Sequence, residues 1–265
     1  MSLQLLHISD SHLYSDPASL LKGIRPHDSF TAVLADAYRS FPVVDAVILG
    51  GDMAQDEQPE TYHRLVSMLP DWQAPMMLTP GNHAALGYLS GTLIPALRAR
   101  GAYSDRLLSG RWQIITLNSH HPGHISGLLP ASELERLQQL LSVSAGIHTL
   151  IALHHHPIPI GSRWLDEIDL VNRDALWEIV HKHSHVRALL CGHIHQSFDT
   201  IHDGVRVLGS PSTCVQFTPG TDNFALADIS PGYRWLELLD DGNISTTVHR
   251  ITGFIPPDLL NNDPY

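Results

Sequence analysis

Two histidines that follow an apolar run are the strongest chemical signal in the sequence. The stretch VRALLCGHIHQ places His193 and His195 directly after the apolar residues 186–191 and Gly192. Such a run is typical of a buried strand, and a glycine lets the backbone turn sharply where the strand ends. One imidazole there would usually be satisfied by a single hydrogen bond. A pair indicates a metal site if carboxylates and further imidazoles occupy equivalent places elsewhere.

Four other apolar runs end in the same kinds of residue, in the letters DSH, GGD, GNH and LHHH. The residues concerned are Asp10, His12, Asp52, Asn82, His83 and the three histidines 154–156. The carboxyl ends of strands in an α/β sheet face a common crevice, so distant ligands can become neighbours. Mixed oxygen and nitrogen ligands suit Mn, Fe or Zn better than Mg or Ca. These are more side chains than one tetrahedral site requires, which favours a dinuclear centre.

The elements that must position these residues alternate between strands and helices. Strands are expected within residues 3–9, 43–56, 74–83, 111–119, 148–157 and 186–195, and helices within 26–41, 59–69, 130–143 and 173–183. This order predicts a mainly parallel sheet with crossover helices. Beyond His195 the helical spacing fades, and turns at Asp203-Gly204 and Asp241-Gly242 predict antiparallel hairpins.

Composition restricts the class of protein. The chain of 265 residues is 43% hydrophobic and carries a formal charge of −11, without a run of lysine or arginine. A globular enzyme fits this composition, whereas nucleic acid and membranes are not expected partners. No signal peptide is found, and only two cysteines occur, so we expect a cytoplasmic protein. With no linker-like shift in composition, we expect a single domain over residues 1–255 and a loosely held C-terminal tail over 256–265.

Taken together and in order, the motifs resemble those of the calcineurin-like metallophosphoesterase superfamily: D-x-H, G-D-x(n)-D, G-N-H, a later histidine and G-H-x-H. The sequence is similar in particular to the bacterial class III 3′,5′-cyclic AMP phosphodiesterases. This similarity is carried by GDMAQD, LHHHPIPIGSRWLDEIDLVN, LLCGHIHQ, GSPSTCVQF and PGYRWLEL. The resemblance implies an α/β fold, a four-layer α-β-β-α sandwich of two mixed β-sheets flanked by helices.

The resemblance also implies a role for each site residue. One metal ion would be held by Asp10, His12, Asp52 and His195, and the other by Asn82, His154, His193 and the shared Asp52. His155 is a rival of His154, which is preferred because the strand directly precedes it. His83 remains as the catalytic residue. Contact with the substrate is implied for His12, Asp52, Asn82, His83, His154 and His195.

The expected reaction is hydrolysis of cyclic AMP (cAMP) to 5′-AMP. Two divalent ions, Fe²⁺ and/or Mn²⁺, would bridge a hydroxide nucleophile, and protonated His83 would protonate the leaving 3′ oxygen. Two other functions stay open at this point. One is hydrolysis of a different small phosphodiester, such as a glycerophosphodiester, or with broad specificity. The other is a weakly catalytic module that binds metal and nucleotide. The native metal pair and the oligomeric state are not determined by the sequence.

Several positions allow two interpretations. The superfamily usually has a carboxylate after G-N-H, but this chain has Ala84, so the partner expected to orient His83 is absent. Asp56 either ligates a metal or caps the following turn. Trp164, in GSRWLDEIDLVN, either shapes the nucleotide end of the pocket or serves packing. His7 is expected to be a core histidine instead of a ligand.

Overall fold

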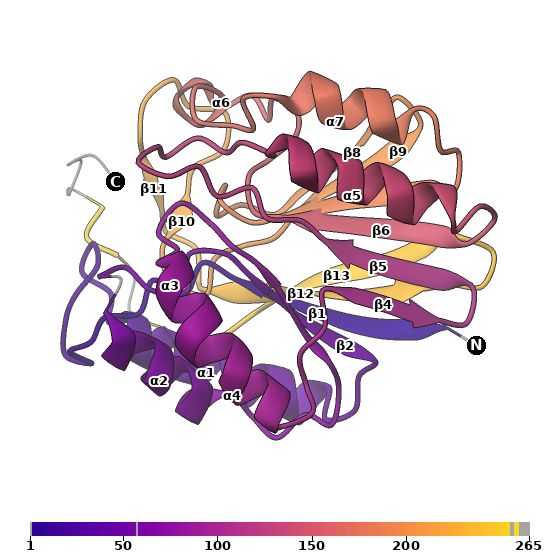
Figure 1. Cartoon of the computed structure of the whole chain (residues 1–265). Helices are drawn as coiled ribbons and strands as arrows, with labels where there is room; N and C mark the ends of the chain where they lie inside the picture. Colours follow the sequence, from indigo (N-terminus) through magenta and orange to yellow (C-terminus); the bar gives the residue numbers. More distant parts are fainter. Residues whose placement is uncertain (1, 57, 255–256, 260–265) are drawn as a thin grey trace.

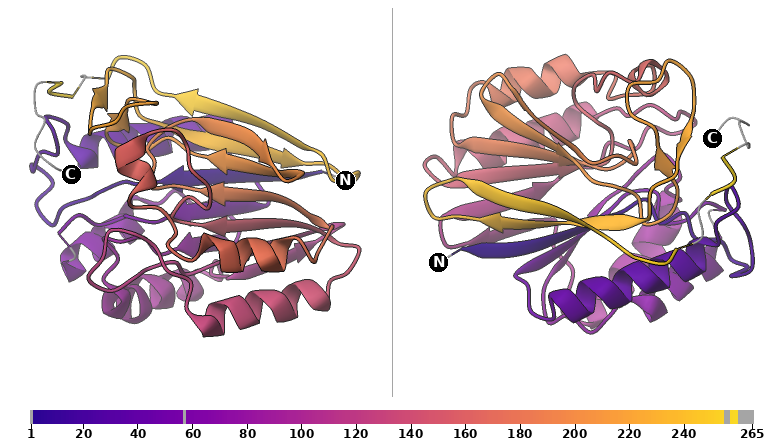
Figure 2. Two further views of the ribbon diagram at one scale, coloured as in Figure 1. Left: turned by 90° about the horizontal axis from the view of Figure 1, so that it is seen from above. Right: turned by 180° about the vertical axis from the view of Figure 1, so that it is seen from behind.

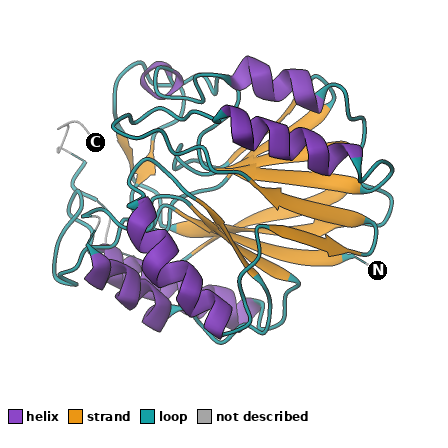
Figure 3. Ribbon diagram, in the orientation of Figure 1, coloured by secondary structure: helices purple, strands orange, loops and turns teal. Residues whose placement is uncertain are grey.

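Two β-sheets lie face to face in the computed structural model, and helices cover their outer faces (Figures 1 and 3). The structure describes residues 2–56, 58–254 and 257–259. The five-stranded sheet has the order β13-β12-β1-β2-β3, and the six-stranded sheet has the order β4-β5-β6-β7-β9-β8. The first sheet contains β1 (Leu3–Ser9), β2 (Ala46–Gly50), β3 (Met76–Thr79), β12 (Gly232–Leu238) and β13 (Ile244–Arg250). The second contains β4 (Arg106–Ser109), β5 (Trp112–Thr116), β6 (His148–Leu153), β7 (Val186–Cys191), β8 (Phe198–His202) and β9 (Val205–Gly209).

Three apolar clusters separate four layers. Strand β1 contributes to two of them, because alternate side chains of a strand point to opposite faces. Leu5 packs between the two sheets, whereas Leu6 and Ile8 pack against the helices α1 (Pro26–Ser40) and α2 (Pro59–Met68). A third cluster lies between the six-stranded sheet and the helices α5 (Ala131–Ser142) and α7 (Arg173–Val180). The views from above and behind show the same layering (Figure 2). The expected four-layer α-β-β-α sandwich is confirmed.

The strand directions decide where the strand ends meet. Strands β1, β2 and β3 pair in parallel, as do β5, β6 and β7. Each of these strands therefore delivers its C-terminal residue to the same edge of its sheet. The last third of the chain adds antiparallel pairs, β8 with β9 and β12 with β13. The expected turn at Asp203 and Gly204 has φ of 49° and 82°, as a tight hairpin requires.

The longest helical segment that was not predicted from the sequence follows β3. It comprises α3 (Leu86–Tyr88), the π-helical turn η1 (Leu89–Leu93) and α4 (Ile94–Ala99). Its buried residues Leu89, Leu93 and Leu97 are spaced by four, which places them on one face against the helical side of the five-stranded sheet. Glycines and a proline within the segment had obscured this pattern.

The C-terminal end is described only in part. Residues 255–256 and 260–265, which make up most of the expected tail, lie outside the described residues. Within residues 257–259, the backbone N–H of Asp258 donates a hydrogen bond of 2.9 Å to the carbonyl of Lys22. In the described part of the chain, we find no helix that is long and apolar enough to cross a membrane.

Candidate metal centre

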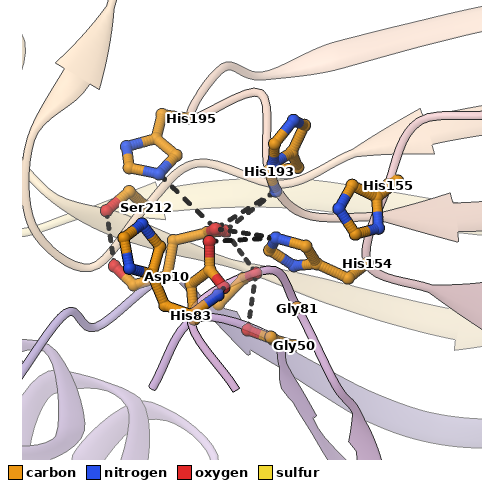
Figure 4. A network of polar contacts seen from close by, with 12 residues as sticks. Asp10, Gly50, Gly81, His83, His154, His155, His193, His195 and Ser212 are labelled. Atoms are coloured by element: carbon orange, nitrogen blue, oxygen red, sulfur yellow. Dashed lines mark hydrogen bonds and ion pairs between the residues drawn. The ribbon is translucent and has the colours of Figure 1, made fainter. Parts of the chain in front are cut away.

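The residues predicted as ligands lie at the C-terminal ends of strands from both sheets. Figure 4 shows Asp10, His154, His193 and His195 converging from these ends. The five-stranded sheet brings Asp10 and His12 after β1, Asp52 after β2 and Asn82 after β3. The six-stranded sheet brings His154 after β6, and His193 and His195 after β7. The centre is therefore formed where the two sheets meet, and neither sheet supplies it alone.

Donor atoms converge in overlapping groups. One ligand atom each from Asp10, His12 and His195 lie within 4.8 Å of one another, and so do those of Asp10, Asp52 and His154. His195 Nε2 lies 3.4 Å from Asp10 Oδ1, and His154 Nε2 lies 3.1 Å from Asp52 Oδ2. Histidines that follow strands of the six-stranded sheet thus lie beside the carboxylates of Asp10 and Asp52, which follow strands of the five-stranded sheet. Such a cluster of nitrogen and oxygen donors is typical of a cation-binding site.

The backbone at this edge is unusual. Five of the predicted ligands have a positive φ, which side chains other than glycine rarely adopt. The five are Asp10 (56°), His12 (46°), Asp52 (40°), His193 (66°) and His195 (49°). Among the other described non-glycine residues, only Lys22 and Asp203 share this conformation. Such strain gathers at functional sites, where the surrounding structure compensates for its cost.

Hydrogen bonds fix how two of the histidines face the centre. His12 Nδ1 donates to Gln55 Oε1 at 2.6 Å, and His195 Nδ1 donates to the carbonyl of Val215 at 2.8 Å. In both rings Nε2 is then left as the acceptor, and the two Nε2 atoms lie 3.2 Å apart. Two lone pairs that face each other at this distance favour a cation close to both, which is the arrangement expected of metal ligands.

His193 is oriented by a hydrogen bond at Nε2, whereas His12 and His195 are oriented through Nδ1. Its Nε2 donates to the carbonyl of Ile168 at 3.1 Å, so Nδ1 is the acceptor. One donor atom each from His154, His155 and His193 lie within 4.8 Å of one another. The buried ring of His193 is also stacked on that of His156, with centroids 5.7 Å apart.

The neighbours His154 and His155 differ in their surroundings. His155 Nδ1 contacts Ser119 Oγ at 2.8 Å, and its Nε2 contacts the carbonyl of Ile125 at 3.0 Å. Neither ring nitrogen of His154 has a hydrogen-bond partner among the described residues, although its Nε2 lies beside Asp52. Both rings are fully buried. The geometry therefore favours His154 over His155 as a metal ligand.

Three glycines bring the backbone close to these side chains. A Cβ on Gly51 would collide with the ring of His154, and one on Gly81 would collide with Asp52 Oδ1 and the same ring. A Cβ on Gly192 would collide with Ser9 Oγ, which itself contacts Asp10. The centre is thus lined by backbone that leaves room only for the ligand side chains.

Burial and mutual charge set the protonation of the carboxylates. Burial alone would raise the pKa of Asp10 and of Asp52, but the adjacent histidines outweigh it and lower both pKa values. The chief neighbour is His195 for Asp10 and His154 for Asp52. Burial would likewise lower the pKa of His154, yet the two carboxylates raise it. The two carboxylates therefore stabilise the protonated form of His154 relative to the neutral form.

Burial favours the neutral form of two other imidazoles of the centre, His12 and His193. Burial, reinforced by His195, lowers the pKa of His12 to about 3. Burial also lowers the pKa of His193, with His155 and His154 adding to the effect. Ionised carboxylates and neutral imidazoles are the protonation states that metal binding requires. Together with the unpartnered Oδ1 of Asn82 among the described residues, this donor set fits divalent cations.

A cavity of about 500 Å³ opens beside the centre. Its polar end is lined by Asp52, Asn82, His83 and His193, and its apolar lining includes Ile125, Trp164, Leu165, Ile168 and Phe217. The backbone N–H of His83 donates to Asp52 Oδ1 at 2.8 Å, and its ring lies edge-on to His12. The partly exposed imidazole of His83 therefore borders both the donor atoms and the cavity.

Ala84 lies against the apolar core. It is 7% exposed, packs in the cluster between the five-stranded sheet and its helices, and also lines the cavity next to His83. The carboxylate that lies within 4.8 Å of the His83 ring is Asp52. No second carboxylate shares that donor group in the described part of the chain.

Two residues at this site were missed by the sequence analysis. His120 lines the cavity, and its Nδ1 donates to the carbonyl of Gly81 at 2.8 Å. It follows β5, so it belongs to a further strand end that carries a histidine, and that position was the available signal. Gln55, the partner of His12, gave no signal, because its contact joins segments that are 43 residues apart.

The hydrogen bonds of Asp56 and His7 indicate structural roles for both residues. Asp56 accepts hydrogen bonds from Thr61 Oγ1 at 2.6 Å and from the backbone N–H of Ser15 at 2.5 Å, as expected for a carboxylate that holds a turn. His7 lies fully buried in β1, with Nδ1 at 2.6 Å from Ser210 Oγ.

The fold and the cluster of ligand side chains define a metal-dependent phosphoesterase. Residues 3–197 match the family of calcineurin-like phosphoesterases, and the chain belongs to this family. It is 37% identical over 254 residues to the 3′,5′-cyclic adenosine monophosphate phosphodiesterase CpdA of Pseudomonas aeruginosa, with 94% of this chain and 90% of that protein covered. The CpdA of Escherichia coli is 38% identical over 251 residues, with the same coverage.

Solved structures support the same fold at low sequence identity. A dimetal phosphatase from Danio rerio matches with a TM-score of 0.62 and 14% identity, covering 94% of this chain and 98% of that one. A purple acid phosphatase from yellow lupin matches with a TM-score of 0.66 and 12% identity, covering 94% of this chain and 52% of that one. The sandwich architecture is therefore shared by enzymes of quite different sequence.

Proposed function

We propose that this protein hydrolyses 3′,5′-cyclic AMP to 5′-AMP with a pair of divalent cations. The observation that carries the proposal is the convergence of Asp10, His12 and His195 with Asp52 and His154 beside a cavity of about 500 Å³. The bacterial relatives that cover most of the chain are named for this reaction. The lowered pKa values of Asp10, Asp52, His12 and His193 further support a metal-dependent reaction.

The first cation would be held by Asp10, His12, Asp52 and His195, and the second by Asn82, His154, His193 and the shared Asp52. The orientation of the imidazole nitrogens supports this division. When bound, such a pair supplies charge neutralisation at the phosphate and activation of water. A mixed set of nitrogen and oxygen donors favours Fe²⁺ and/or Mn²⁺.

The chain itself must then position the phosphate and supply a proton. His12, Asp52, Asn82, His83, His154 and His195 would surround the phosphate. The hydrogen bond from the His83 backbone to Asp52 fixes His83 relative to the centre. Protonated at the start of the reaction, the His83 imidazole would donate a proton to the leaving 3′ oxygen. His120, tied to the Gly81 carbonyl, would support the loop that carries Asn82 and His83.

The decisive measurement is hydrolysis by metal-reconstituted protein, with identification of the product. We expect turnover of cyclic AMP to 5′-AMP, and we expect cyclic GMP and a chromogenic diester to be cleaved less efficiently. Rapid cleavage of other diesters with no action on cyclic nucleotides would contradict the proposed substrate. Bound metal and bound nucleotide without turnover in any divalent ion would contradict an enzymatic role.

The His83→Ala variant tests the proton donor. It should retain both cations and lose activity by roughly 10²–10⁴-fold, the range typical of general acid catalysis. His63→Ala is a suitable control, because His63 is exposed on α2, outside the lining of the cavity. Full turnover in a metal-loaded His83→Ala protein would remove His83 from the mechanism.

We further propose a cytoplasmic protein with one catalytic domain over residues 1–255. Both cysteines are free and buried, which supports a reducing compartment. An apolar cluster between the two sheets supports a single folding unit. Residues 256–265 would form the C-terminal tail.

A further inference from the structure

The apolar end of the cavity has no role in the chemistry at the phosphate. Ile168 and Trp164 are only half-buried, and Ile125 is 49% exposed, yet all three line the same cavity as His83 and Asp52. Apolar side chains left uncovered beside a polar centre indicate a surface that a ligand covers. A phosphate group would have no favourable contact there.

We propose that Trp164 and Ile168 form a base wall, against which the purine of the nucleotide lies while its phosphate lies at the metal centre. This inference rests on the proposed function and names the part of the site that recognises the substrate. A planar heteroaromatic base gains from contact with an indole and an aliphatic side chain. A glycerol group, by contrast, presents no planar face to lie against these two side chains.

The indole of Trp164 is held in place by other aromatic rings. Its centroid lies 5.0 Å from that of Phe217 and 5.3 Å from that of Phe224, both in edge-to-face geometry. Phe217 is in turn stacked on His195, with centroids 4.1 Å apart and planes within 6°. The base wall is thus a rigid continuation of the metal centre, and such pre-organisation reduces the cost of binding.

The segment that carries the wall is fixed at two further points. Asp166, in α6 (Arg163–Asp166), accepts the backbone N–H of Ile160 at 2.7 Å and that of Gly161 at 3.2 Å. The carbonyl of Ile168 accepts the hydrogen bond from His193 Nε2 at 3.1 Å. The side chain of Ile168 therefore lines the cavity, while its backbone carbonyl orients His193, a proposed metal ligand.

A binding experiment can isolate the base from the rest of the nucleotide. The ligands are 5′-AMP and ribose 5-phosphate, which differ only in the base, with inorganic phosphate as a third ligand. All are titrated into Mn²⁺-loaded protein by calorimetry. We expect the wild type to bind 5′-AMP at least about tenfold more tightly than ribose 5-phosphate, since stacking of a base on an aromatic side chain has this order of effect.

Trp164→Leu and Ile168→Ala should each remove most of this difference and leave the affinities for ribose 5-phosphate and phosphate unchanged. Ile168→Ala keeps the carbonyl that orients His193, so it remains informative if Trp164→Leu folds poorly. Trp235→Leu is the matched control. Trp235 is a half-buried indole, stacked on Phe41 and outside the lining of the cavity.

The outcomes separate the base wall from the proposed reaction. An unchanged ratio of the 5′-AMP and ribose 5-phosphate affinities in folded Trp164→Leu and Ile168→Ala proteins overturns the base wall, even if the wild type hydrolyses cyclic AMP. An equal loss for all ligands overturns it too. If the wild type does not hydrolyse cyclic AMP, the proposed reaction fails. The base wall is then still decided by the same affinity ratio, and a wild-type ratio near one would overturn it.

Discussion

Neighbouring histidines of the LHHH motif illustrate how the surroundings decide what a residue can do. His155 has both ring nitrogens in contact with Ser119 and Ile125, whereas His154 faces Asp52 and Asp10. The side chains are chemically identical and equally buried. A difference in metal binding between them would therefore arise from the hydrogen bonds that each has already formed.

Replacing each histidine in turn tests this difference. His154→Ala should lose one of the two cations per chain, because a proposed ligand is removed. His155→Ala should keep both cations but lower the free energy of unfolding by about 1–3 kcal/mol, because Ser119 and the Ile125 carbonyl lose a buried partner. Metal content by elemental analysis and urea unfolding measure the two effects. Loss of metal in His155→Ala with full occupancy in His154→Ala would reverse our assignment.

The alanine at position 84 gives a second test at the scale of a residue. Ala84 packs in the core on one side and lines the cavity on the other, so an aspartate there would be largely buried and would have apolar neighbours on its core side. We expect Ala84→Asp to lower the free energy of unfolding by about 1–3 kcal/mol. Ala84→Ser, a smaller polar change, serves as the comparison in urea unfolding. An Ala84→Asp protein as stable as the wild type would mean that a partner, such as His83, accommodates the carboxylate.

At the scale of elements, the strands were the most predictable part of the molecule. Runs of buried apolar residues marked β1, β2, β3, β6 and β7, and polar residues at their ends marked the site. The segment of α3, η1 and α4 was not foreseen, because Gly87, Gly91 and Pro95 are poor helix formers. Its packing on the core compensates for that weakness.

The partners that orient the ligands could not be predicted from the sequence. The types of ligand follow from chemistry, and their places follow from the strand ends. The contacts of His12 with Gln55, and of His193 with Ile168, depend on loops whose path is set only by the whole fold. The sequence therefore predicts the candidate ligands, but not the hydrogen bonds that orient their side chains.

The loop between β3 and α3 offers a steric test. Gly81 approaches Asp52 and His154 so closely that a methyl group would displace them. Gly81→Ala should therefore weaken metal binding by at least about tenfold, the scale of effect seen when metal-ligand orientation is disturbed. Metal titration followed by elemental analysis measures this.

Gly91→Ala is the matched control for Gly81→Ala. A Cβ at Gly91 would meet no atom within 4 Å, and the position lies in the helical segment η1. This variant should bind metal like the wild type. Normal metal affinity in Gly81→Ala would show that the loop can move away without cost, and would contradict the close fit.

The whole molecule combines an acidic overall charge with a buried group of histidines. Burial lowers the pKa of His7 and of His12 to about 3. In the unfolded chain both groups would titrate near 6.5. Between these values the unfolded state binds more protons than the folded state, so stability falls as the pH falls.

We therefore expect the metal-free protein to lose stability below a pH of about 6.5. Each of the two histidines should contribute about 1.4 kcal/mol for each pH unit in the window down to about 3. The raised pKa of His154 acts in the opposite sense, and only above its unfolded value. Urea unfolding of chelator-treated protein at pH 6.5 and 5.0 measures the slope. A midpoint that does not move would show that these histidines are not buried as neutral groups.

The division of the centre between two sheets has a consequence for synthesis of the chain. Asp10, His12, Asp52 and Asn82 emerge from the ribosome well before His154, His193 and His195. A partly synthesised chain has only the earlier set and cannot complete either proposed set of ligands. Capture of the proposed cations should thus be a late event that follows docking of the second half, so that the nascent chain does not yet hold divalent cations.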